Sequence, residues 1–64
     1  MKYEIGMKIK IINMKNEPQY NNKIGVIVHI DALGQLHGTW GSLAIIPEID
    51  TIEILENNDE TNNK

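Results

Sequence analysis

The chain has 64 residues, a formal net charge of −3 and no cysteine. A chain of this length forms one small domain, and without cysteine it forms neither disulfides nor thiolate zinc sites. Its apolar runs are all far shorter than the roughly 20 residues of a transmembrane helix, and its first residues lack the apolar stretch of a signal peptide. We therefore expect a small protein of the cytoplasm.

Apolar residues alternate with polar residues along much of the chain, and this period of two is typical of half-buried β-strands. The first predicted strand covers residues 7–11. Ile12 then interrupts the alternation, which indicates a β-bulge or the end of the strand. The turn-forming residues 13–22, which surround Pro18, predict a long first loop.

Residues 23–40 predict a β-hairpin, because two largely apolar segments flank a turn sequence that contains glycine. Pairing Ile30 with Leu36 keeps one face apolar and places His29 directly opposite His37 on the other face. A register that is shorter by two residues would preserve the faces but separate the two histidines. We favour the first register.

The same register assigns the even-numbered residues of the first hairpin strand, such as Val26, to the core side together with Trp40. Gly38 would then let a neighbouring chain cross close to the indole. Trp40 is either the anchor of the core or a partly exposed platform for a ligand, and the sequence leaves both alternatives open. Ile27 falls on the outward side of its strand.

Two more strands are predicted over residues 42–46 and 51–55, separated by a turn at Pro47. One long loop, two tight turns and a single helical turn before the last strand are the connections of an SH3-like barrel. We therefore predict an all-β fold, a small five-stranded SH3-like barrel over residues 1–55, whose closure would remove free sheet edges. Residues 56–64 contain no apolar side chain, so we predict a disordered, solvated acidic tail there.

Few residues could support catalysis or bind a metal. Two neighbouring imidazoles, His29 and His37, would supply half of a zinc or nickel site, and Asp31 or a symmetry-related chain would have to complete it. Ser42 is the single serine, and its surroundings do not form the strained strand-to-helix turn of a nucleophile. The carboxylates lie at turns, where they are common. We therefore predict no enzyme activity, no metal and no cofactor.

A binding surface is the alternative to a catalytic site. SH3-like barrels bind partners between the long first loop and the loop after the second strand, which points to the loop residue Tyr20. Ile27, with Ala44, Ile46 and Leu55, belongs to a set of apolar residues that either form an exposed patch or become buried by the curvature of the barrel. Our candidate binding residues are Tyr20, Lys23, Ile27, His29, His37 and Trp40.

The hairpin sequence resembles a known nucleic-acid-binding element. Residues 25–31, followed by Gly34, Gln35 and Leu36, resemble the KOW-type hairpin of ribosomal proteins and transcription elongation factors. Members of that group that bind nucleic acid use Lys and Arg in the loops, whereas the loop here, residues 31–34, contains an aspartate and no basic residue. The chain also has no arginine, and so we do not expect nucleic-acid binding.

A larger set of residues resembles the domain of unknown function 4314 family, whose members are short domains of low-GC bacteria, their phages and mobile elements. The similarity spans residues 6–52, and its most specific residues are Asp31, Gly34, Trp40, Pro47 and Asp50. It implies an SH3-like, KOW-related barrel and no assigned activity. The abundance of Ile, Asn and Lys fits an AT-rich genome, such as that of a phage or a mobile element.

Three hypotheses follow for function. The first is a non-catalytic module, encoded by a phage or mobile element, that caps or inhibits a protein partner through one face of the barrel. The second is a small homo-oligomer for phage counter-defence that sequesters a nucleotide signal between subunits, with Lys8, Lys10 or Lys23 meeting phosphate and Tyr20 or Trp40 stacking on the base. The third is nucleic-acid binding, which the charge disfavours. We favour the protein partner.

Overall fold

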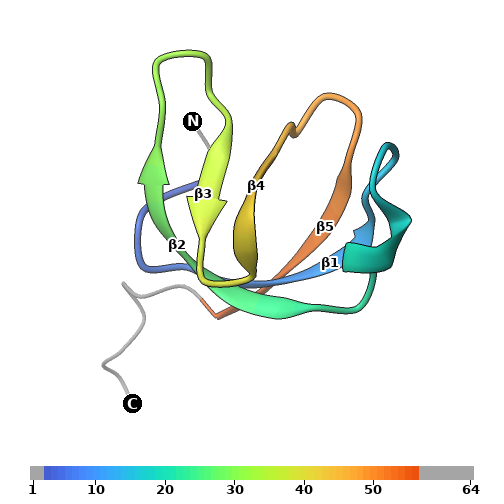
Figure 1. Cartoon of the computed structure of the whole chain (residues 1–64). Coiled ribbons are helices and arrows are strands. Elements are labelled where there is room, and N and C mark those ends of the chain that lie inside the picture. The colour runs from blue at the N-terminus through green and yellow to red at the C-terminus, as the bar shows by residue number, and fades with distance from the viewer. Residues whose placement is uncertain (1–2, 57–64) are drawn as a thin grey trace.

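The fold is built from five antiparallel strands, as the sequence predicts. The computed structural model describes residues 3–56, and Figure 1 shows how the strands follow one another. The elements are β1 (Lys8–Asn13), the 3-10 helix η1 (Pro18–Tyr20), β2 (Ile24–Ile30), β3 (Leu36–Gly38), β4 (Gly41–Ile45) and β5 (Thr51–Glu56). They form one sheet in the order β4-β3-β2-β1-β5. The all-β class and the long first loop, which contains η1, are therefore confirmed.

Strand β2 takes part in two ladders. Its residues Ile24–Val26 pair with β1, and its residues from Ile27 onward pair with β3. Because β2 pairs with β1 along its first half and with β3 along its second half, the sheet curves around the core (Figure 1). The outer strands β4 and β5 are not paired with each other in the part of the chain that the structure describes, so the sheet stays open where we predicted a closed barrel.

A single turn joins the two outer strands. The backbone amides of Ile49 and Asp50 both donate to the carbonyl oxygen of Ile46, at 3.0 and 2.9 Å. These bonds make the single helical turn that the sequence predicts before the last strand. The turn carries the chain from β4 at one edge of the sheet to β5 at the other edge, but within residues 3–56 the two strands form no ladder with each other. Five strands with the predicted connections can therefore leave the barrel open.

The bulges and the last strand agree in part with the sequence. The register between β1 and β5 shifts between Ile11 and Asn13, so the interruption predicted at Ile12 is confirmed as a bulge. Strand β5 includes Glu56, which we had predicted to be the first residue of the tail. Residues 57–64, the rest of that predicted tail, lie outside the described residues.

The predicted hairpin register is confirmed near the turn. β2 and β3 pair antiparallel, and the register partners are Ile27 with Gly38, His29 with His37, and Ile30 with Leu36. Ile27 and His29 lie two positions apart on β2, whereas their partners Gly38 and His37 are adjacent on β3. Val28 is therefore an extra residue, and the strand bulges there.

This bulge reverses the predicted faces of the first half of β2. Ile27 is fully buried, whereas Val28 is 54% exposed and Val26 is partly exposed. Our assignment of Ile27 to the outward side was wrong, because we carried the alternation from Ile30 back along the strand without a bulge. An extra residue in a strand moves every side chain beyond it to the opposite face.

Trp40 is a core residue, and this settles the alternative that the sequence left open. Its side chain is only 5% exposed, and its indole Nε1 donates to the carbonyl oxygen of Leu43 at 2.8 Å. A methyl group on Gly25 would lie 3.0 Å from the indole Cε3, so the ring packs directly on backbone. The buried apolar cluster consists of Met7, Ile9, Ile11, Met14, Ile27, Leu36, Trp40 and Ile45. Burial of side chains of this size contributes about 1.5–3 kcal/mol each.

Candidate functional site

A small pocket opens between the long first loop and strand β4. Its volume is about 100 Å³, and it is lined by Met14, Asn16, Glu17, Leu43, Ala44, Ile46 and Asp50. Three of these residues come from the first loop, and the others come from β4 and the turn that follows it. The pocket therefore lies between two segments that are far apart in the sequence.

The Asp50 carboxylate connects the two walls of this pocket. Its Oδ1 accepts a hydrogen bond from the Lys15 backbone amide at 3.0 Å, and its Oδ2 accepts one from the Ile46 backbone amide at 2.8 Å. Asp50 is 8% exposed, so both bonds are sheltered from solvent. Hydrogen bonds to a charged acceptor contribute about 1.5–3 kcal/mol each. The first loop is thus held at a fixed distance from the turn.

Further contacts hold the first loop in place. The backbone amide of Met14 donates to Oδ1 of Asn21 at 2.8 Å. The ring of Tyr20 lies against Gly41 at the start of β4, where an added methyl group would lie 2.9 Å from the ring. Lys23 places its Nζ 5.8 Å from the centre of the same ring, at the distance of a cation–π contact. Tyr20 and Lys23 therefore join the loop to the sheet.

The pocket combines an apolar lining with carboxylates. Leu43, Ala44 and Ile46 contribute apolar side chains, and Glu17 and Asp50 contribute the acids. Pockets for drug-sized ligands have volumes of about 300–1,000 Å³, whereas the cavity left by truncating one buried leucine is about 150 Å³. A pocket of about 100 Å³ therefore matches one aliphatic side chain rather than a nucleotide.

A second polar cluster lies on the β2–β3 hairpin. The ring centres of His29 and His37 are 5.5 Å apart, and the rings are tilted by 44°. His37 Nε2 lies 2.9 Å from Asp31 Oδ2, while Asp31 Oδ1 accepts hydrogen bonds from the backbone amides of Leu33 and Gln35, both at 2.9 Å. The hydrogen bond with His37, followed by the backbone bonds, lowers the pKa of the Asp31 carboxyl from its ordinary value of 3.8.

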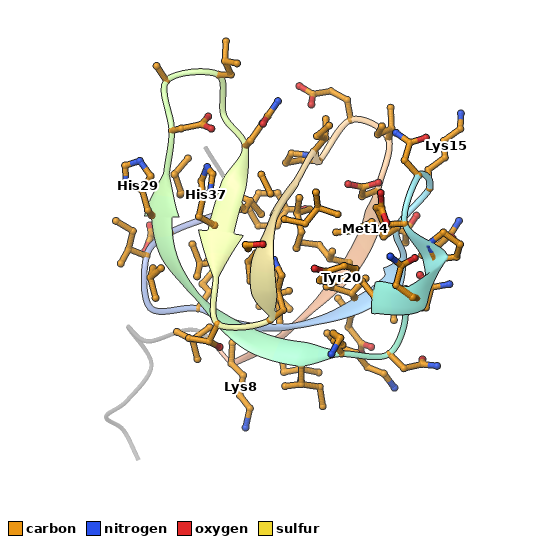
Figure 2. All side chains as sticks on the ribbon, in the orientation of Figure 1. Lys8, Met14, Lys15, Tyr20, His29 and His37 are labelled. Atoms are coloured by element: carbon orange, nitrogen blue, oxygen red, sulfur yellow. The ribbon has the colours of Figure 1, made fainter. Side chains whose placement is uncertain are left out.

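The structure does not bring the six predicted binding residues together. Ile27 and Trp40 are buried in the core and offer no surface to a partner. Figure 2 shows His29 and His37 next to each other on the hairpin, whereas Tyr20, which belongs to the first loop, lies on another part of the molecule. Lys23 accompanies Tyr20 through the cation–π contact.

Sequence reasoning missed most of the pocket. It singled out Ala44 and Ile46, which are half-buried and line the pocket, but grouped them with the buried Ile27. Met14 and Glu17 were assigned to a loop without a role. The available signal was the apolar Met14 within an otherwise polar loop, since a loop residue of this kind usually packs against the body of the domain.

Comparisons of the chain with family models, with curated proteins and with solved structures found no match. The resemblance to the domain of unknown function 4314 family therefore stays a prediction. Within residues 3–56, no helix has the length and apolar character needed to cross a membrane. In the same part of the chain, no group of three or more metal-binding side chains is positioned to hold an ion.

Proposed function

We propose that this protein is a binding module for a protein partner, and that the pocket between the first loop and β4 receives one aliphatic side chain of that partner. The observation that carries this proposal is the pocket itself: an apolar lining that includes Leu43 and Ala44, with a volume of about 100 Å³. A partly buried apolar pocket that accepts an anchor residue is the usual centre of a protein interface.

The carboxylates of the pocket favour a partner that carries a positive charge next to its anchor residue. Glu17 lines the pocket from the first loop, where it accepts a hydrogen bond from the Gln19 side chain. A cationic residue next to the anchor of the partner would meet this acid at the rim. The preferred partner segment then contains Leu, Ile or Met beside Lys or Arg, because opposite charges at a rim direct orientation and specificity.

The pocket is held open before a partner arrives. Asp50 fixes the distance between the first loop and the Ile46 turn, and Tyr20 packs the loop onto Gly41. A preformed site avoids part of the entropy cost of ordering a loop on binding. We further propose that the protein acts in the cytoplasm and that a phage or mobile element encodes it, since the abundance of Ile, Asn and Lys fits an AT-rich genome.

A selection from a random peptide library, with a matched pair of variants, tests the proposal. Wild-type protein should enrich peptides that share one aliphatic residue beside a basic residue. Ala44→Leu places a larger side chain in the pocket and should abolish binding of the enriched peptides. Ser42→Leu is the control, because Ser42 is exposed on the same strand and does not line the pocket.

The outcomes separate the hypotheses. Loss of binding in Ala44→Leu with binding retained in Ser42→Leu supports the pocket, provided that both variants unfold within a few degrees of wild type. Equal peptide binding by all three proteins would overturn the pocket as the site. A native mass spectrum that shows an oligomer carrying a nucleotide would instead support the sequestration hypothesis.

A further inference from the structure

The histidines of the hairpin form a surface pair on the turn side of the bulge. His29 is the register partner of His37, next to the pair Ile30–Leu36, while Ile27 on the other side of the bulge lies in the core. His29 is exposed and His37 is partly exposed, so both imidazoles are accessible from solvent. This pair lies on a different part of the fold from the pocket and plays no part in the proposed function.

The spacing of the two rings suits a shared metal ion. Imidazole nitrogens bind zinc at about 2.0–2.1 Å, so two rings on one tetrahedral ion have their centres about 5 Å apart. The observed distance between the ring centres of His29 and His37 is 5.5 Å. A small rotation of exposed side chains would close the difference, and β2 and β3 already fix the separation of the backbones.

Asp31 prepares one of the two rings for this role. When neutral His37 carries its proton on Nε2, Asp31 Oδ2 accepts that proton in the 2.9 Å hydrogen bond, and Nδ1 retains its lone pair. A metal-binding histidine is commonly oriented in this way by a carboxylate on its other nitrogen. Asp31 is itself held by the backbone amides of Leu33 and Gln35.

We propose that His29 and His37 bind one divalent transition-metal ion of the class that prefers imidazole, namely Cu²⁺, Ni²⁺ or Zn²⁺, with Asp31 as the positioning residue of His37. Water completes the coordination, because the described residues present no third ligand in place. The sequence alone led us to predict no metal, since it contains only two histidines; the spacing of the rings and the orienting carboxylate are what the structure adds.

Calorimetric titration of the full chain, without an affinity tag, with NiCl₂ tests this site. We expect one ion per chain, released by EDTA, and quenching of the fluorescence of Trp40, the only tryptophan. His29→Gln and His37→Gln should each lower the affinity at least tenfold. Asp31→Asn should lower it by about 10–100-fold while leaving both ligands in place. Glu48→Gln, an exposed acid on another turn, should leave it unchanged.

The same titrations can overturn the proposal. Equal Ni²⁺ affinity in wild type, His29→Gln and His37→Gln would place the ion elsewhere on the chain. One ion for every two chains would exclude a site formed within one chain. His29 is exposed, so its variant should keep the unfolding temperature of the metal-free wild type, and a lost signal cannot then be ascribed to misfolding. Ni²⁺ should raise the unfolding temperature of wild type and of Glu48→Gln but not that of His29→Gln or His37→Gln.

Discussion

The indole of Trp40 packs on the backbone of Gly38 so closely that no side chain fits at that position. A Cβ atom on Gly38 would overlap both the six-membered ring of Trp40 and the carbonyl oxygen of Val26. Neither neighbour can withdraw easily, because Trp40 is buried and bonded to Leu43 and Val26 belongs to the central strand. Trp40, which has the largest side chain of the core, therefore requires a glycine at position 38.

Gly38→Ala should consequently destabilise the fold by about 3 kcal/mol, at the upper end of the range for overpacked cores. Gly34→Ala is the matched control: Gly34 has φ +84°, but nothing lies within 4 Å of an added Cβ. The control should lose only about 1–2 kcal/mol, from backbone strain. Urea unfolding followed by Trp40 fluorescence measures both values. An unchanged urea midpoint in Gly38→Ala would contradict the packing described here.

The bulge in β2 predicts opposite responses at neighbouring positions. Ile27→Ala should cost about 2–5 kcal/mol, because the Ile27 side chain is fully buried. Val28→Ala should change the free energy of unfolding by no more than about 0.5 kcal/mol, because Val28 is 54% exposed. Chemical denaturation of both variants gives the comparison. If Val28→Ala lost more stability than Ile27→Ala, the side chains of β2 would alternate without a bulge and Val28 would face the core.

Asp50 should be more important for stability than its place in a turn suggests. Asp50→Ala removes the acceptor of the Lys15 and Ile46 amides, and we expect a loss of about 2–4 kcal/mol. Asp50→Asn keeps one carbonyl oxygen and should lose less. Glu48→Ala, an exposed acid in the same turn, serves as the control and should be nearly neutral. Equal unfolding temperatures of Asp50→Ala and Glu48→Ala would refute this role of Asp50.

The low pKa of Asp31 predicts how stability depends on pH. A carboxyl group with a lower pKa in the folded state stabilises the fold above its ordinary pKa, here 3.8, and this contribution is lost as the pH falls through the folded value. With EDTA present, wild type should therefore be more stable than Asp31→Asn near pH 5, and the difference should shrink towards pH 2. Unfolding curves across that range test the sign. A difference that grew on acidification would mean that the pKa of Asp31 is raised.

Part of this fold could be read from the sequence because polar and apolar residues marked the faces. Lys8 and Lys10 identify the outer side of β1, and their alternation with isoleucine gave the correct strand. Strand β2 has no such marker between Ile24 and Val28, where both faces carry apolar residues or glycine. The pattern there is equally compatible with the odd-numbered or the even-numbered residues facing the core, and the bulge determines which of the two sets does so.

The two clusters differ in how far the sequence could reveal them. His29 and His37 face each other within one hairpin, and the register of a hairpin follows from its turn and its apolar face. The pocket is lined by Met14 and Ile46, which are separated in the sequence by three strands. Their common placement follows from the curvature of the whole sheet, which the pattern of a single sequence does not reveal.

The extra residue in β2 also has a consequence for insertions and deletions. Removing Val28 would make the pairs Ile27–Gly38 and His29–His37 consecutive, so the ladder would become regular while Gly25 and Ile27 kept facing the core. A residue added to the first half of β2 would instead reverse the faces beyond it, and Trp40 would then meet a side chain where it now rests on glycine. The strand should therefore tolerate the loss of its one extra residue but not the gain of another.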